Sequence, residues 1–258
     1  MHKKIAPIER DDLSKAWAHA FTETVNSPGG KLSRLIVTIH LRDGVIVETP
    51  EIKQLLEAAL LARDQCKVDT VASTIFPKSQ WNSKESAQKL YDRYEKTWLY
   101  VQKRHANRNG VYFRRLTAFD NSKDPTKPVN QLDHIIKTWR DHKNHRHSAL
   151  QAAIFDPSKD HGHSQQRGFP CLQQVAFDAQ GANGKQGLVV TGFYATQTLF
   201  EKAYGNYLGL AQLGLFMAHE LGLQLAEVTC IASLAKSSGN YGIGELRPLA
   251  EQLKPYLQ

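Results

Sequence analysis

The residue with the clearest chemical potential is Cys171, which follows Pro170 and opens a strand-like run at 171–179. A cysteine thiolate is a strong nucleophile when neighbouring positive charge lowers the pKa of the thiol. Arg146 and Arg167 are the candidates for that charge, since Arg167 lies four residues before the cysteine. The alternative is an inert thiol in a core strand, because free cysteine is among the most buried residue types.

Asn206 is the second candidate, because it lies inside the apolar stretch 199–222, which predicts a buried helix. A buried amide has to find hydrogen-bond partners. Its side chain offers one acceptor and two donors, so it can pair with the O4 and N3–H edge of a uracil ring. A structural hydrogen bond to a neighbouring strand is the alternative.

Positive charge is concentrated in the middle of the chain. Residues 78–146 include 16 lysines and arginines against 7 acidic residues, a net +9, whereas all 258 residues together carry +8. Within this segment Arg114 and Arg115 follow Tyr112 and Phe113, an interleaving that is typical of nucleotide or single-strand binding. A nucleotide, another anionic ligand, or a nucleic acid bound by region 78–147 is therefore the expected partner. There are two alternatives. In one, the lysines form a solvated helix face, and in the other, Arg114 and Arg115 are charged residues that prevent an edge strand from pairing with another chain.

Histidines and the other cysteines suggest no further site. The histidines lie in runs such as DHKNHRH (141–147) and DHGH (160–163), but their spacing matches no zinc signature, so no metal is expected. Cys66 and Cys230 are expected to be buried cysteines that take no part in the chemistry. Three sparse cysteines, no apolar run of about 18–20 residues and no signal peptide indicate a cytoplasmic protein that does not enter a membrane.

The elements that position these residues follow from hydrophobic periodicity. Helices are expected at 11–25, 49–63, 83–106, 129–142, 199–222 and 244–257. Extended segments are expected at 33–41, 44–49, 67–76, 108–119, 148–155, 171–179, 186–195 and 223–235. Several strands, one buried helix and peripheral helices predict a two-layer α/β (α+β) arrangement. No internal repeat or linker is visible, so one domain is predicted over 1–258.

From about residue 108 onward, the order of these segments resembles the thymidylate synthase family. GVYFRRL (110–116) is similar to an arginine-bearing loop of that family. The segment 130–157 is similar to its Asp-Gln helix and the strand that ends in Trp-Asn-Pro. FPCLQQVAFDAQ (169–180) resembles the strand that starts at the nucleophilic Pro-Cys, and YGNYLGLAQLGL (204–215) resembles the helix with the base-reading asparagine.

The resemblance implies a homodimer built back-to-back on a mixed β-sheet. It also implies that Cys171 attacks C6 of a pyrimidine nucleotide, that Asn206 holds the base, and that a reduced folate, methylenetetrahydrofolate, delivers a one-carbon unit to C5. Arg146, with Arg167 or Arg114, would supply the positive charge, Arg146 acting across the dimer interface. Tyr112, in the arginine-bearing loop, would contact the substrate.

Three positions depart from the family pattern. Ala195 stands where the family carries its phosphate-binding arginine, Thr198 where it carries an aspartate, and Leu172 where a histidine follows the nucleophile. A methyl group cannot replace a bidentate guanidinium. Two interpretations therefore stay open: a C5 one-carbon transferase with a different pyrimidine substrate, or a diverged protein of the same fold that binds a nucleotide, nucleic acid or protein partner without turnover.

Overall fold

A mixed six-stranded sheet forms one layer of the computed structural model, which describes residues 5–121, 123–124, 126–142, 144–162, 169–182 and 185–257. The strand order is β1-β2-β6-β5-β4-β3. The β1–β2 and β5–β6 pairs are parallel, and the other neighbours are antiparallel. The strands are β1 (Ile8–Arg10), β2 (Lys31–His40), β3 (Gln151–Ala153), β4 (Leu172–Ala182), β5 (Lys185–Thr198) and β6 (Gln224–Lys236).

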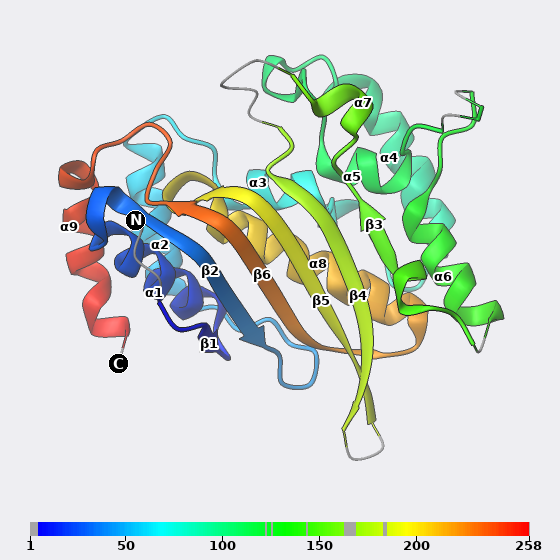
Figure 1. Cartoon of the computed structure of the whole chain (residues 1–258), viewed down its shortest axis with the longest axis horizontal. Helices are drawn as coiled ribbons and strands as arrows, with labels where there is room; N and C mark the ends of the chain where they lie inside the picture. Colours follow the sequence, from blue (N-terminus) through cyan, green and yellow to red (C-terminus); the bar gives the residue numbers. More distant parts are fainter. Residues whose placement is uncertain are drawn as a thin grey trace.

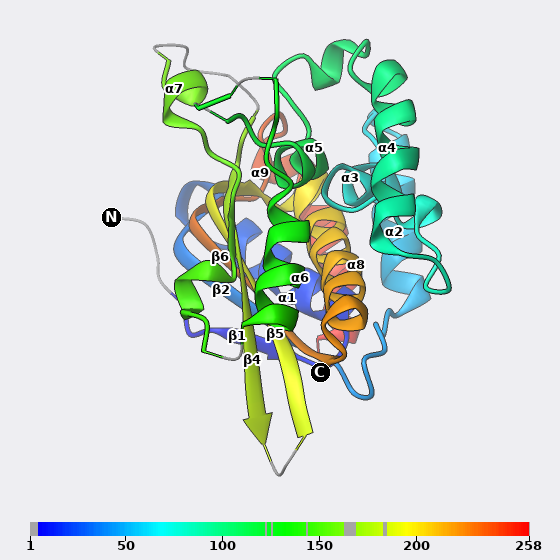
Figure 2. The same ribbon diagram turned by 90° about the vertical axis from the view of Figure 1, so that its right-hand side faces the viewer.

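Helices form the second layer, so the expected α+β class with a mixed sheet is confirmed. Figure 1 views the sheet from its open face, with α1 and α8 behind it, and Figure 2 shows the two layers from the side. The helices are α1 (Leu13–Val25), α2 (Pro50–Leu61), α3 (Val68–Ile75), α4 (Ala87–Val101), α5 (Tyr112–Thr117), α6 (Gln131–Asp141), α7 (Pro157–Asp160), α8 (Tyr204–Leu221) and α9 (Ile243–Leu253).

Two segments expected to be extended are helices. Residues 67–76 form α3, because Val68, Val71, Ala72 and Ile75 recur at helical spacing and are all buried. The β-branched residues in this segment suggested a strand, but tertiary packing decides the outcome. The segment 108–119 includes α5, whose Phe113 and Leu116 are fully buried on one face.

The strand expected at 44–49 is also absent from the described sheet. A single antiparallel bridge joins Arg42 to Val45. Beyond the bridge the chain leaves β2, because the parallel strand β1 occupies that edge of β2. Val45 and Val47 consequently remain 56% and 46% exposed.

Glycines allow α3 to pack very closely on α8. A Cβ built at Gly205 would lie 2.5 Å from the Cβ of Val71, and one at Gly209 would lie 2.7 Å from the carbonyl oxygen of Ala72. Since real side chains do not tolerate such distances, these positions require glycine. The contact fixes α3 beside the first turns of α8, where Asn206 lies.

A short π-helical turn, Leu199–Ala203, connects β5 to α8. Glu201 in this turn is buried and accepts hydrogen bonds from the hydroxyl of Ser238 and the backbone N–H of Gly239. Such wide turns occur frequently at functional sites. The turn leads directly into α8, so Lys202 and Asn206 follow the end of β5 within the same helical segment. No helix in the described part of the chain has the length and apolar character needed to cross a membrane.

Candidate functional site

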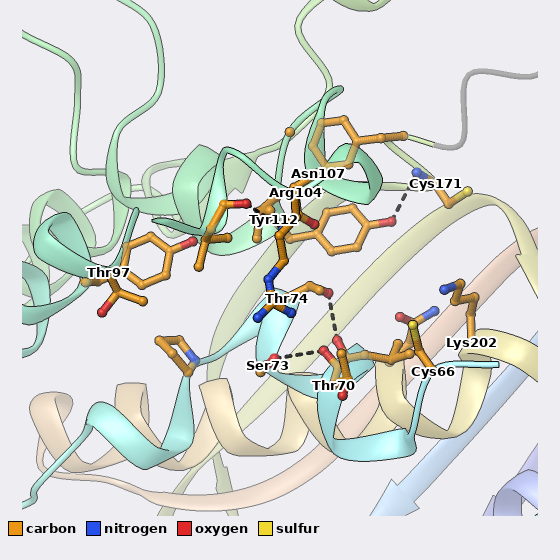
Figure 3. A pocket seen from close by; sticks show the side chains of 18 of the residues that line it. Cys66, Thr70, Ser73, Thr74, Thr97, Arg104, Asn107, Tyr112, Cys171 and Lys202 are labelled. Carbon is orange, nitrogen blue, oxygen red and sulfur yellow. Dashed lines mark hydrogen bonds between the residues drawn. The ribbon is translucent and has the colours of Figure 1, made fainter. Parts of the chain in front are cut away.

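A cavity of about 440 Å³ lies between the end of β5, the start of α8 and the helices α3, α4 and α5 (Figure 3). This volume is in the usual range for small-molecule sites. Cys171, Asn206 and Tyr112 all line it, so the structure brings together three residues that the sequence singled out. Thr196, Gln197 and Thr198 contribute the end of β5.

The backbone of Cys171 is held from both sides just before β4 begins. Its carbonyl oxygen accepts from the backbone N–H of Ala195 at 3.0 Å, and its own N–H donates to the hydroxyl oxygen of Tyr112 at 3.3 Å. Cys171 packs at the margin of the core and is only partly buried. The backbone of Cys171 is therefore held in place by hydrogen bonds, and its side chain lies between the core and the cavity.

Burial raises the pKa of the Cys171 thiol, and the nearby ammonium groups of Lys202 and Lys236 oppose this shift without cancelling it. The expectation of a lowered pKa is therefore wrong for the ligand-free protein. Among the residues that the structure describes, the positive charge near the thiol comes from these two lysines and not from Arg146. At neutral pH the thiol is protonated, so its reactivity depends on what binds beside it.

Asn206 lies in the first turn of α8, and only 4% of its surface is exposed. Its side-chain amide makes no hydrogen bond to any residue that the structure describes, which overturns the alternative of a structural bond to a strand. An amide without a protein partner at a cavity wall is satisfied by water or by a bound ligand. Because Asn206 lines the cavity, its acceptor and donors are available to a bound molecule.

Gln197 adds a second amide that the sequence did not single out. Its Oε1 accepts from the hydroxyl of Tyr207 at 3.3 Å, whereas its Nε2 is buried without a partner among the described residues. The residue lies at the end of β5 and also lines the cavity. Because Thr196 and Thr198 flank Gln197, nothing in the sequence distinguished it from its polar neighbours.

Tyr112 connects the cysteine to the aromatic side of the cavity. Its ring lies 5.1 Å from the ring of Phe169, measured between centroids, and its hydroxyl accepts from the Cys171 N–H. Burial raises the pKa of Tyr112, so the phenol keeps its proton and can still donate one hydrogen bond. Tyr94 and Val101 also line the cavity, so part of its wall is apolar and aromatic.

Two of the arginines predicted to bind substrate, Arg114 and Arg146, do not line this cavity in the single chain. Arg114 pairs with Glu95 and lies 5.4 Å from the centroid of the Trp98 ring. Arg146 is exposed and precedes the short 3₁₀ turn before β3. Arg167 falls in 163–168, outside the described residues. Among the residues that the structure does describe, no group of His, Cys, Asp and Glu side chains could hold a metal ion.

Two cationic residues of the cavity were missed by the sequence reasoning. Lys202 lies four residues before Asn206, so helical spacing could have indicated it. Arg104 follows the end of α4 and is one of many basic residues in its segment, so nothing in the sequence distinguished it. Its place in the cavity depends on tertiary structure.

Comparison with known proteins does not assign this chain to a family. No protein-family model matches this chain, and no curated protein is significantly similar to it in sequence. The function therefore has to be argued from the site itself.

Proposed function

We propose that this protein binds a pyrimidine nucleotide or related pyrimidine in the cavity and acts as a thymidylate synthase-like C5 one-carbon transferase. The observation that carries the proposal is the placement of the Cys171 thiol and the unpaired Asn206 amide on one base-sized cavity. The two groups suit the two halves of the reaction, because one attacks the ring and the other holds its polar edge.

In the proposed step the sulfur of Cys171 forms a bond to C6 of the ring, and the thiol proton is released to water. The C5=C6 π electrons move through C5 to O4, where the Asn206 amide donates a hydrogen bond. The ring then carries a nucleophilic C5. Lys202 favours the thiolate form of Cys171 that this step requires.

A reduced folate, when bound, would supply the one-carbon unit. Tyr94, Tyr112 and Phe169 are the residues that would hold its flat ring, because they present aromatic surface to the cavity. The fold that the resemblance implies, a thymidylate synthase-like sheet with its buried helix, is part of the same proposal. A cytoplasmic location is supported by three free cysteines, since free thiols are usual in a reducing compartment.

A covalent adduct tests the proposal. The protein is incubated with a 5-fluoropyrimidine nucleotide, with and without methylenetetrahydrofolate, and its intact mass is measured. We expect an added mass that maps to Cys171 and disappears in Cys171→Ala. Cys66→Ala is the matched control, because Cys66 also lines the cavity but lies on the α3 side. Absence of any adduct in the wild-type protein would contradict the proposal.

A second candidate is binding without turnover, and the raised pKa of Cys171 is the observation that favours it. Ala195, in place of the arginine that the resemblance expects, adds to it. In that case Cys171→Ala leaves ligand affinity unchanged and no adduct forms with either protein.

We further propose that two copies associate through the open face of the sheet. Ile36, Ile231 and Phe193 are paired in register across β2, β6 and β5. Their neighbours Val37, Cys230 and Gly192 face the helices, so these three face outward, and Phe193 is 41% exposed. An apolar row on a helix-free sheet face is self-complementary about a twofold axis, which is the common symmetry of dimers.

A further inference from the structure

The charge of the cavity lining is one-sided. Arg104 and Lys202 are its ionic residues, and no described residue of the lining is an aspartate or glutamate. Neither cation forms an ion pair with a residue that the structure describes. A cavity that holds two unpaired positive charges and no carboxylate favours an anionic ligand.

Arg104 differs from the other arginines between 93 and 115, because each of those has a partner. Arg93 pairs with Glu85 at 2.7 Å, Arg115 pairs with Asp160 at 3.0 Å, and Arg114 pairs with Glu95. Arg108 contacts the ring of His105. The guanidinium of Arg104 therefore keeps its five donors available, in a geometry that suits two oxygens of one anion.

The turn that carries Arg104 is fixed. The carbonyl oxygen of Val101 accepts both from the Arg104 N–H at 3.2 Å and from Nδ2 of Asn107 at 2.9 Å. Figure 3 shows the Arg104 side chain reaching into the pocket between Tyr112 and Thr74, on the side away from Cys171 and Lys202. Because hydrogen bonds fix this turn, less conformational entropy is lost when the Arg104 side chain becomes ordered on binding.

The facing wall presents hydroxyl oxygens as acceptors. Ser73 and Thr74 donate their hydroxyl protons to the carbonyl oxygens of Thr70 and Val71, both at 2.7 Å. On the α4 side, Thr97 donates to the carbonyl oxygen of Arg93 at 3.0 Å and accepts from Nε2 of Gln80 at 3.1 Å. Their remaining lone pairs suit ligand hydroxyl or N–H groups, so this side of the cavity accepts a polar, hydroxylated group beside the anion.

We infer that Arg104 binds the negatively charged group of the cavity's ligand, so that the ligand bears a phosphate or carboxylate at the side of the cavity away from Cys171. This oxyanion subsite replaces the one that Ala195 cannot form. The inference rests on the proposed function only for the position of the pyrimidine ring, because the charge argument stands without it.

Two ligand pairs test the subsite, because a nucleotide phosphate and a folate carboxylate share its chemistry. Affinities are measured by calorimetry for uridine 5′-monophosphate against uridine, and for folic acid against its dimethyl ester. We expect the charged member of at least one pair to bind the wild-type protein about tenfold or more tightly than its neutral counterpart. The pair that shows the difference identifies the source of the anion.

The matched variants are Arg104→Gln and Arg108→Gln, both at exposed arginines near the end of α4. Arg104→Gln is expected to remove most of the charged-to-neutral preference, and Arg108→Gln is expected to keep it. Circular dichroism confirms that both variants fold. No preference in the wild-type protein, or a preference unchanged by Arg104→Gln, overturns the inference.

The adduct experiment separates this inference from the proposed function. If Cys171 forms an adduct but Arg104→Gln leaves the preference unchanged, the subsite is wrong and the reaction stands. If no adduct forms while Arg104→Gln abolishes the preference, the reaction is wrong and the subsite stands.

Discussion

Gly205 of α8 approaches Val71 of α3 so closely that a Cβ on the glycine would lie 2.5 Å from the Cβ of the valine. The next residue in α8, Asn206, carries the amide that faces the cavity, and the cavity side of α3 carries Thr70 and Thr74. The close packing of the two helices therefore sets the width of the site as well as part of the core.

Gly205→Ala is expected to destabilise the protein by about 1–3 kcal/mol, because the added methyl group overpacks a rigid contact. Gly244→Ala is the matched control, since Gly244 also lies in a helix, α9, but a Cβ there meets nothing within 4 Å. The control should be neutral or more stable by about 0.5–1 kcal/mol. Urea denaturation measures both, and equal effects of the two substitutions would contradict the packing argument.

The same contact shows why the sequence predicted only part of the fold. Periodicity located α1, α2, α6, α8 and the central strands, because each has a long, clear apolar pattern. It misassigned α3, whose valines and isoleucine favour a strand until their burial against the glycines of α8 is known. Helix α5 was missed for a similar reason, since Phe113 packs against Phe76 and Tyr94 from distant segments.

The sequence likewise predicted only some of the residues of the candidate site. Cys171 and Asn206 were found from their residue types together with the family resemblance, and Tyr112 from its place beside two arginines; the structure places all three on one cavity. Lys202 and Arg104 could not be ranked above the other basic residues of the chain. Their selection depends on which charges remain unpaired after folding, and that is a tertiary property.

The pH dependence of Cys171 alkylation follows from its burial. Because its pKa is raised, the reactive thiolate forms at a higher pH than in an exposed cysteine. Iodoacetamide labelling of Cys171 in a Cys66→Ser background, followed by peptide mass spectrometry, should show a rate that is low at neutral pH and rises above the ordinary thiol range.

Lys202→Gln should move this labelling profile to still higher pH, because the substitution removes a positive charge that favours the thiolate. Lys254→Gln is the control, since Lys254 pairs with Glu251 beyond the end of α9. Two results would show that the electrostatic account is wrong: a labelling midpoint at a lower pH than that of an exposed cysteine, or a midpoint that Lys202→Gln does not shift.

Asn206→Leu should separate stability from binding. The amide has no protein partner among the described residues, and because it lines the cavity, water can hydrate it in the absence of a ligand. Leucine has the same branching and number of side-chain heavy atoms, and the substitution removes no protein hydrogen bond, so we expect little change in the free energy of unfolding, while pyrimidine binding and adduct formation fall at least tenfold. A loss of stability together with unchanged binding would instead assign the amide a structural role.

Phe193→Asp should disrupt the proposed dimer without unfolding the chain. Phe193 lies at the β5 end of the outward row with Ile231 and Ile36, and a carboxylate there would be buried unpaired when two sheets meet. Leu61→Asp is the control, because Leu61 is 75% exposed on α2, away from the sheet. Sedimentation equilibrium of both variants and the wild-type protein measures the mass. We expect Phe193→Asp to be a monomer of 29.0 kDa and the other two to be dimers. A wild-type monomer would remove the twofold arrangement and, with it, any contribution of Arg146 from a second copy.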